Sequence, residues 1–502
     1  MGINRYYPPQ IDRLTNVISL EEYLDREAFG TDSPFKTEPF YTGLYRKLLK
    51  ISTKCLESII GRTILIENES RELILFNKST RNLLHKLLSE GKLLEWNCGV
   101  NNFEYQTHYA CDVYSDKVIN DKDETIFSRG MSTGHGSAES LNEALVIALA
   151  ENLERYAAMN WSDSYFTEYS IDHLEKSDMS FFYHSYLDYK LYDYQINKGK
   201  KTKWCVAKNL HTLEEVMLPA GMVYYTYPMH HKDEPLFLEV SSNGVAAYSD
   251  TEGALLGGLY ESFERDGFLM YWLNNIAPKK IKTDTITNSD TAETISQLEK
   301  RNLDLHLLDC RTEYGIPTVV SVLMDNLSGG IYIHAASGLN VDKVIDKIIA
   351  DNQRFNPNYY STKPSIEVDE IADLYQRMMF WHGGHMSGHI EWFLKGDEIS
   401  YEKYKNQFVP FNHSRTEEIN FIKKKLKDLK SDAYYYEFPD PLAKDAGLKV
   451  VRAYVPDLMP VYFNEKKKHL NVPRLYKFAK VMGLRDKETT VDELNKIPHP
   501  FI

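Results

Sequence analysis

Cysteine is scarce in this 502-residue chain, and its five residues are scattered. They are Cys55, Cys98, Cys111, Cys205 and Cys310, with no C-x-x-C spacing among them. An odd number of cysteines at wide spacing argues against both a disulfide framework and a zinc knuckle. The sequence also lacks any apolar run of about 18 residues, and its first segment, MGINRYYPPQIDRL, lacks the apolar core of a signal peptide. We therefore expect a cytoplasmic protein without a membrane span.

A Walker-type phosphate loop, G-x-x-x-x-G-K-[ST], is absent as well, so any nucleotide site must be built in another way.

Positive charge is in deficit, because the chain has 59 Lys and Arg residues and 72 Asp and Glu residues, for a formal net charge of -13. An acidic surface argues against general binding to nucleic acid or to anionic membranes. With 43% hydrophobic and 26% charged residues, the composition is that of a folded protein.

The pattern along the chain predicts an α/β (α+β) fold of mixed sheets and long helices. Residues 1–97 predict a small N-terminal α/β unit, a β-hairpin flanked by helices, which is either a structural cap or a peptide-binding module. In the remainder, 98–502, residues 304–324 predict two strands around a Gly-Ile-Pro turn. Residues 340–353 predict a helix with Asn340 as its N-cap.

The strongest signal is an E-x-x-E-R signature that occurs twice. Its two copies are Glu151-Asn-Leu-Glu154-Arg155 and Glu261-Ser-Phe-Glu264-Arg265. Each copy lies in a predicted helix and places two carboxylates about one turn apart, so both can point into the same space. The second helix is apolar on several sides and should be mostly buried, where charges need partners or a metal ion. Four carboxylates and two guanidinium groups are the composition expected around metal ions and a polyphosphate.

A candidate nucleotide-facing loop precedes each copy. The first is the glycine-rich stretch of residues 128–137, where backbone N–H groups at Gly134 and Gly136 could approach phosphates closely. The second is Ser242-Asn243-Gly244, in which Asn243 offers an amide for a base edge or a ribose.

These elements, in this order, resemble the YcaO family. AxxENLERY is similar to the first family motif and SSNGVAAYSDTEGALLGGLYESFERDGF to the second, and the resemblance covers roughly residues 98–502 as a YcaO-like catalytic domain. The ending Pro-His-Pro-Phe resembles the proline-rich tail of the azoline-forming members, which are cyclodehydratases of thiazole/oxazole-modified ribosomal peptides such as bacteriocins. The resemblance therefore implies an ATP-dependent, Mg2+-dependent peptide cyclodehydratase that forms thiazoline or oxazoline from Cys, Ser or Thr.

The resemblance also implies residue roles. The metal ligands would be Glu151, Glu154, Glu261 and Glu264. Nucleotide contacts would come from Gly134, Gly136, Arg155, Ser242, Asn243, Arg265, Gln353 and Arg452. A tail that positions or deprotonates the substrate would present Pro498, Pro500 and Ile502. A structural ion pair is an equally good interpretation of Arg452.

Two features depart from the family pattern. The later helix has Ala350-Asp351-Asn352-Gln353, with alanine where the family usually has a glutamate, so Asp351 either substitutes for that acid or one ligand is missing. The alternating-proline ending is also truncated at Ile502.

Implied partners are a ribosomally made precursor peptide, a leader-binding protein (E1-like or carrying a peptide-recognition element) and a flavin-dependent azoline dehydrogenase. A homodimer is a family-level expectation. Thioamide or amidine formation, or an ATP-binding accessory role without cyclisation, are the alternative functions. The spacing of His382, His385 and His389 resembles a zinc site, but the intervening glycines argue against it.

Overall fold

The computed structural model describes most of the chain from residue 140 onward and a set of strands before it. The described ranges are 10–11, 14–19, 64–68, 73–75, 93–103, 106–115, 118–119, 125–127, 133–138, 140–170, 201–232, 234, 241–352, 364–411, 414–470 and 472–501. The chain forms two compact units, one of residues 1–119, 127–156 and 441–447, the other of residues 120–126, 157–440 and 448–502. The boundary expected at 97/98 falls inside a strand, Leu93–Phe103, and the two-domain division stays a prediction.

The first unit is built on antiparallel sheets. A four-stranded sheet has the order β1-β5-β6-β9, and a three-stranded sheet has the order β2-β3-β4. The strands are β1 (Gln10–Ile11), β2 (Leu14–Ser19), β3 (Ile64–Asn68), β4 (Leu73–Leu75), β5 (Leu93–Phe103), β6 (Gln106–Ser115) and β9 (Thr133–Ala138). The β3–β4 pair confirms the N-terminal hairpin, while the helices expected on either side of it lie outside the described residues. Helices α4 (Leu141–Met159) and α14 (Pro441–Asp445) follow later in the chain.

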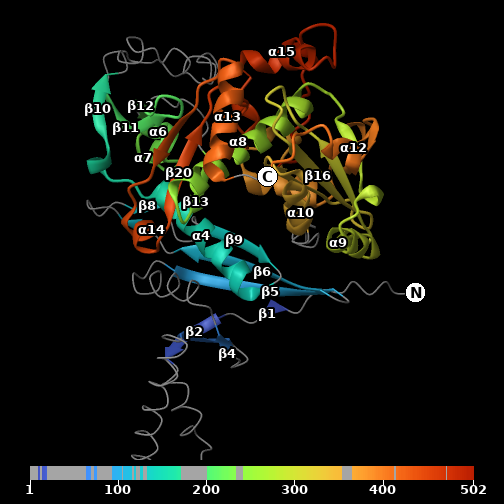
Figure 1. Ribbon diagram of the computed structural model, residues 1–502. Coiled ribbons are helices and arrows are strands. Elements are labelled where there is room, and N and C mark those ends of the chain that lie inside the picture. Colours follow the sequence, from blue (N-terminus) through green and yellow to red (C-terminus); the bar gives the residue numbers. More distant parts are fainter. Residues whose placement is uncertain are drawn as a thin grey trace, which may run out of the picture. The chain divides into compact units, whose positions relative to one another are not determined.

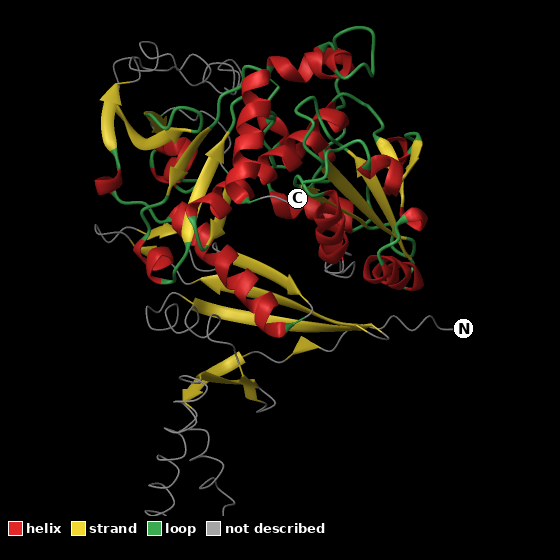
Figure 2. Ribbon diagram, viewed as in Figure 1, coloured by secondary structure: helices red, strands yellow, loops and turns green. Residues whose placement is uncertain are grey.

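The second unit places one long helix, α8 (Thr251–Leu273), between two sheets (Figures 1 and 2). One sheet has the order β10-β11-β19-β20-β13, with β12 added beside β11, and the other has the order β17-β16-β15-β14-β18. The strands of the first are β10 (Thr167–Ser170), β11 (Lys201–Asn209), β12 (Glu215–Pro219), β13 (Val245–Tyr248), β19 (Tyr434–Glu437) and β20 (Lys449–Tyr454). Those of the second are β14 (Lys279–Lys282), β15 (Leu303–Asp309), β16 (Thr318–Asp325), β17 (Ile331–Ser337) and β18 (Glu398–Ser400).

The central position of α8 explains why it is apolar on all sides. Its first half packs in a core cluster with β20 residues such as Val451, and its second half, from Phe268 to Leu273, belongs to another cluster that includes Val320 of β16. Alternate residues of a strand face opposite sides of a sheet, so Val319 of the same strand packs in a third cluster, with helix α10 (Val341–Asn352). A helix covered on both sides leaves little solvent for charges in its middle, and in the second signature Glu261 is 22%, Arg265 17% and Glu264 5% exposed.

The predictions of mixed sheets and long helices, of the strand pair at 304–324 and of the helix after Asn340 are confirmed. The Asn340 side chain accepts a hydrogen bond from Lys343 N–H at 3.2 Å, as an N-cap does. The remaining elements are β7 (Val118–Ile119), β8 (Thr125–Phe127), η2 (Asp163–Tyr165), α6 (Ala220–Val223), α7 (Tyr227–His230), η5 (Thr283–Thr285), α9 (Ser289–Lys300), η7 (Val368–Glu370), α11 (Leu374–His382), η8 (Ser387–His389), η9 (Glu391–Leu394), α12 (Tyr401–Lys405), α13 (Arg415–Asp428), η10 (Glu465–Lys467), α15 (Pro473–Val481) and η11 (Val491–Glu493).

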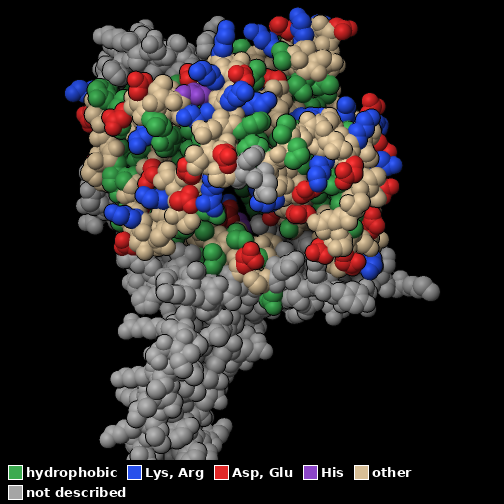
Figure 3. Space-filling model, in the orientation of Figure 1, with side chains coloured by type: hydrophobic (Ala, Val, Ile, Leu, Met, Phe, Trp, Pro, Cys, Tyr) green, Lys and Arg blue, Asp and Glu red, His purple; other side chains and the backbone are tan. Residues whose placement is uncertain are grey.

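On the face drawn in Figure 3, basic and acidic side chains are interspersed over the described surface. Among the described residues, no helix has both the length and the apolar character needed to span a bilayer.

Candidate active site

The second signature follows the part of α8 that packs closely against β13 and the loop before it. The helix begins after Asp250, whose carboxylate accepts a hydrogen bond from Gly253 N–H at 2.7 Å. One turn before the signature, Gly258 faces the Gly244 carbonyl so closely that a Cβ there would lie 2.4 Å from the oxygen. Glycine at this position lets the helix lie against the loop that precedes β13, and that loop is the one predicted to face nucleotide.

Glu261 joins this loop to the helix. Its Oε2 accepts a hydrogen bond from Gly244 N–H at 2.7 Å, and its Oε1 accepts one from Arg265 at 2.9 Å. Gly244 has a φ of +78°, a conformation that favours glycine, and Val245 N–H closes the turn by donating to the Ser242 carbonyl at 2.8 Å. Each carboxylate oxygen accepts more than one bond, so Glu261 keeps capacity for a further ligand.

Glu264 lies deeper, and its environment is different. It is 5% exposed, and its Oε1 accepts hydrogen bonds from Ser337 N–H at 3.0 Å and from Lys347 Nζ at 3.3 Å. The carboxylate raises the pKa of Lys347 above its usual value. Glu264 therefore presents a negative charge that β17 and α10 orient, and α8 alone does not determine its position.

The first signature has the same bonding in its own unit. Glu151 Oε2 accepts a hydrogen bond from His135 N–H at 2.6 Å, and its Oε1 accepts one from Arg155 at 2.7 Å. Arg155 also donates to Thr133 Oγ1 at 2.5 Å, and Asp112 pairs with the His135 ring at 2.6 Å. In both copies, then, the first glutamate bonds to its own arginine and to a backbone N–H upstream of the helix.

The predicted glycine-rich loop before the first copy is wrong over residues 133–138, which form strand β9. Gly134 and Gly136 are buried where β9 crosses α4, and a Cβ on Gly134 would lie 1.9 Å from the Ala148 carbonyl oxygen. The glycines are required for close packing of strand against helix. Contact of their N–H groups with phosphate stays a prediction.

Arg452 supports the second loop from β20. Its guanidinium donates to the Asn243 carbonyl at 3.1 Å and to the Ser241 carbonyl at 2.7 Å. Since Arg452 is 5% exposed and bonds to these carbonyls, it acts here as a support for the loop. Asn243 Oδ1 is buried and has no hydrogen-bond partner among the described residues. An unsatisfied acceptor of this kind suits a ligand N–H, because leaving it unpaired costs free energy.

The later helix, α10, gives Asp351 a definite partner. Asp351 Oδ2 lies 2.7 Å from His334 Nε2 on β17, and Lys347 precedes Asp351 by one helical turn. Whether Asp351 replaces the acid missing at Ala350 stays a prediction, and Gln353 lies outside the described residues.

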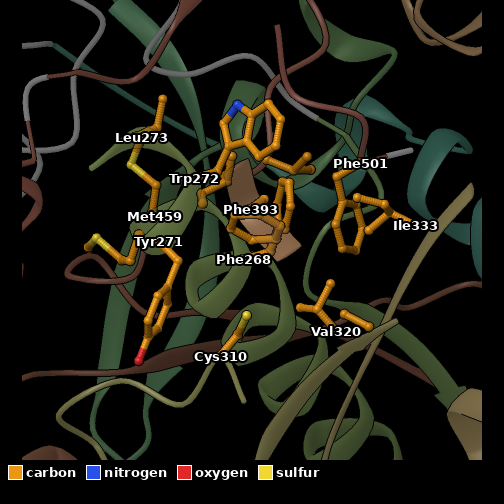
Figure 4. Packing of buried hydrophobic residues seen from close by; sticks show 14 of the residues in the cluster. Phe268, Tyr271, Trp272, Leu273, Cys310, Val320, Ile333, Phe393, Met459 and Phe501 are labelled. Atoms are coloured by element: carbon orange, nitrogen blue, oxygen red, sulfur yellow. The ribbon is translucent and has the colours of Figure 1, made fainter. Parts of the chain in front are cut away.

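The described part of the C-terminal tail is buried and packs against α8. Pro498 and Pro500 are buried, whereas Ile502 lies outside the described residues. The Phe501 ring lies 4.4 Å from the Arg265 guanidinium and 5.0 Å from the Phe268 ring, within the apolar cluster of Figure 4. The tail therefore contacts a residue of the signature, and its catalytic role stays a prediction.

The histidines with zinc-like spacing differ in burial, since His382 is buried whereas His385 and His389 are exposed. Burial lowers the pKa of His382 to about 4. In the described part of the chain, no group of three or more His, Cys, Asp or Glu residues could hold a metal ion. Cys111, Cys205 and Cys310 are free and buried.

A family model described as YcaO cyclodehydratase, ATP- and Mg2+-binding, matches residues 166–459, more than half of the chain. The chain belongs to the YcaO family. The matched range contains the second signature, while the first signature and the tail lie outside it. The family is ATP-dependent and binds Mg2+, and ATP and Mg2+ are the cofactors expected from the sequence.

Relatives in sequence are distant. A Methanothermobacter thermautotrophicus protein whose name states no function is 23% identical over 327 residues, which are 64% of this chain and 80% of that protein. A Rhizobium leguminosarum bv. trifolii protein encoded in the tfuA 3' region is 28% identical over 131 residues. That match spans 25% of this chain and 30% of the rhizobial protein.

Solved structures share the fold. A heterocyclase in complex with substrate and cofactor has a TM-score of 0.62 at 16% identity, covering 96% of this chain and 72% of that chain. The heterocyclase TruD has a TM-score of 0.56 at 15% identity, covering 95% and 69%. YcaO from Methanopyrus kandleri, bound with AMPPCP and Mg2+, has a TM-score of 0.52 at 14% identity, covering 76% and 90%. The predicted YcaO-like fold is confirmed.

The residues of the second signature fit the family's cofactors. Mg2+ is usually held by one or two protein carboxylates together with phosphate oxygens, so Glu261 and Glu264 suffice without a three-acid cluster. Arg265 supplies positive charge, and Asn243 supplies an unsatisfied acceptor. Sequence reasoning missed Lys347 and His334. The one signal for Lys347 was its i, i+4 spacing from Asp351.

Proposed function

We propose that this protein catalyses ATP- and Mg2+-dependent cyclodehydration of Cys, Ser or Thr in a ribosomal precursor peptide, giving thiazoline or oxazoline in the biosynthesis of a bacteriocin-like natural product. The observation that carries the proposal is the oriented, nearly buried Glu264 carboxylate one turn of helix after Glu261, which bonds to the Gly244 loop. The family membership and the shared fold with heterocyclases support the same reaction class.

In this reaction the Cys, Ser or Thr side chain loses its proton and attacks the carbonyl carbon of the preceding amide, so a C–S or C–O bond closes the ring and the amide oxygen becomes an oxyanion. That oxygen is a poor leaving group, and ATP with Mg2+ supplies the phosphoryl transfer that makes it a good one, with release of ADP. The oxygen then departs within phosphate, the amide nitrogen loses its proton, and a C=N bond completes the azoline.

The chain's own residues bind and orient in this scheme. Glu261 and Glu264 would hold Mg2+, and Arg265 would contact phosphate from a position fixed by Glu261 and the Phe501 ring. Ser242 and Asn243 would contact the nucleoside. The proposal also includes metal binding by Glu151 and Glu154 and nucleotide contacts by Arg155, Gln353 and Arg452. Single substitutions of these residues test each role in the same assays.

The proposal includes partner proteins. The Escherichia coli microcin synthetase McbBCD complex, solved with pro-MccB17 bound, contains a chain similar to this one, with a TM-score of 0.52 at 14% identity. By analogy we expect a precursor peptide, a leader-binding partner and an azoline dehydrogenase to act with this protein.

The test combines purified protein, Mg-ATP, the leader-binding partner and a precursor peptide encoded nearby. We expect the peptide to lose the mass of one water molecule per ring, with ADP and phosphate released in equal amounts. Glu264→Gln should abolish both. Glu252→Gln changes the same charge at an exposed position of the same helix, where it bonds only to Thr416 at 2.9–3.0 Å, and should retain activity.

The same assay distinguishes the alternative functions. Thioamide or amidine formation changes the peptide mass by incorporation of an external nucleophile, not by water loss alone. An accessory protein would bind ATP, yet its ATP hydrolysis would not respond to any precursor. Either result would contradict cyclodehydration.

A further inference from the structure

Glu264 has a cation partner that is not part of its own signature. Arg265, the signature arginine, pairs with Glu261 at 2.9 Å. The cation that contacts Glu264 is the ammonium group of Lys347 on helix α10, which lies 3.3 Å from the carboxylate. A carboxylate that is 5% exposed needs such a counter-ion, because a buried charge without a partner is strongly unfavourable.

Lys347 can move between two acceptors. Its side chain is 56% exposed, and the carboxylates of Glu264 and Asp351 both favour its charged form, against the desolvation that burial imposes. A second acceptor is within reach, because Asp351 follows Lys347 at i+4 on α10 and i, i+4 pairs on a helix contact each other. The His334 ring holds the Asp351 carboxylate in place at 2.7 Å.

We infer that Lys347 is a resident counter-ion that is exchanged for the divalent cation. In the metal-free protein it holds the Glu264 carboxylate in place, and when the metal arrives it moves to Asp351. This inference rests on the proposed Mg2+ site at Glu264. It makes Lys347 a positioning residue that sets metal affinity, and it gives Asp351 a role that does not require metal ligation.

The test measures Mn2+ binding by electron paramagnetic resonance, without nucleotide and without turnover. Lys347→Met removes the competing charge and should tighten Mn2+ binding about twofold to fivefold, the range expected for losing one partly exposed ion pair. Lys343→Met is the matched control, since it removes the same charge from an exposed position one turn earlier. It should change Mn2+ affinity less than about twofold. Glu264→Gln should abolish the binding.

Asp351→Asn gives an opposite and independent prediction. Without its second acceptor, Lys347 stays on Glu264, so Mn2+ binding should weaken. In the Lys347→Met background the same substitution should then have no effect, because the two residues act through one step. If Asp351→Asn still weakens binding in that background, Asp351 is itself a ligand and the exchange is refuted.

Two failures are distinguishable. If Glu264→Gln abolishes Mn2+ binding while Lys347→Met leaves it equal to or weaker than that of Lys343→Met, the exchange is overturned and the metal site stands. If wild-type protein binds no Mn2+, or binds it independently of Glu264, both the metal site and the exchange are overturned. Lys347→Arg, which keeps the charge, should bind Mn2+ like wild type, and tighter binding by it would also contradict the exchange.

Discussion

From the contact between Phe501 and Arg265 we predict that the tail affects stability and nucleotide affinity in ways that can be measured separately. Phe501 is 1% exposed and packs on the Phe268 ring at 5.0 Å, so Phe501→Ala removes a buried aromatic side chain. Such truncations cost about 3–5 kcal/mol of unfolding free energy. The residues just before it stay anchored, because Arg377 donates to the His499 carbonyl at 2.5 Å and Trp272 to the Ile497 carbonyl at 3.1 Å. We therefore expect the lower half of that range, about 3 kcal/mol.

Phe501→Leu separates packing from electrostatics. Leucine keeps an apolar side chain in the cluster and should cost less than about 1.5 kcal/mol of unfolding free energy. It loses the π face that lies 4.4 Å from the Arg265 guanidinium, an interaction of about 1 kcal/mol. If that contact orients Arg265 toward phosphate, both variants should bind Mg-ATP about fivefold more weakly than wild type, the affinity equivalent of about 1 kcal/mol.

The assays are urea unfolding followed by tryptophan fluorescence and calorimetric titration with a non-hydrolysable ATP analogue in Mg2+. The expected pattern is a larger loss of stability in Phe501→Ala than in Phe501→Leu and an equal loss of nucleotide affinity in both variants. Wild-type affinity in Phe501→Leu would refute the orientation of Arg265 by the ring and leave Phe501 as a packing residue only.

Three further predictions concern stability. Burial lowers the pKa of His469 to about 4, so below pH ~6.5 the unfolded chain binds a proton at this residue that the folded chain does not bind. The free energy of unfolding should therefore fall by about 2 kcal/mol between pH 7 and pH 5 through this residue. Urea unfolding at the two pH values measures this fall, which should be smaller in His469→Gln. Gly258→Ala forces a Cβ to 2.4 Å from a backbone carbonyl and should cost about 1–3 kcal/mol by thermal unfolding, whereas Gly221→Ala, whose nearest neighbour is 3.7 Å away, should be neutral. Arg474→Met leaves the fully buried Asp266 without its cation and should cost about 3–5 kcal/mol, and a change below 1 kcal/mol would contradict that ion pair.

The sequence predicted the elements whose signal is local. The two signature helices, the strand pair around Gly315-Ile-Pro317 and the helix capped by Asn340 follow from apolar periodicity and turn residues within about 20 positions. The glycines of 133–138 misled, because glycine is favoured both by exposed loops and by strands that pack closely on a helix. Only the contact of these glycines with α4 shows that the segment is a strand packed on a helix and not an exposed loop.

The partners of Glu264 could not be predicted, because they depend on tertiary pairing. Ser337 and Lys347 lie 73 and 83 positions from Glu264 in the chain, and they meet it only because β17 and α10 face α8. The local pattern distinguishes Lys347 from Lys343 only by the acid at i+4, Asp351, and does not indicate a contact with Glu264. The contact of Phe501 with Arg265 is of the same kind, since the tail reaches α8 across a much longer separation.

The bonding of the two signatures argues that the glutamates of E-x-x-E-R are not equivalent. Glu151 and Glu261 each bond to an upstream backbone N–H and to the arginine at i+4, so replacing either would loosen a strand or loop as well as remove a charge. Glu264 makes no contact of that kind with its own arginine, and its cation partner is Lys347, whose side chain is 56% exposed. A glutamine at Glu261 would therefore alter nucleotide and metal binding together through the Gly244 loop. A glutamine at Glu264 leaves the Glu261–Gly244 bond in place and changes only the contacts with Ser337 and Lys347, so metal binding can be measured there without altering that loop.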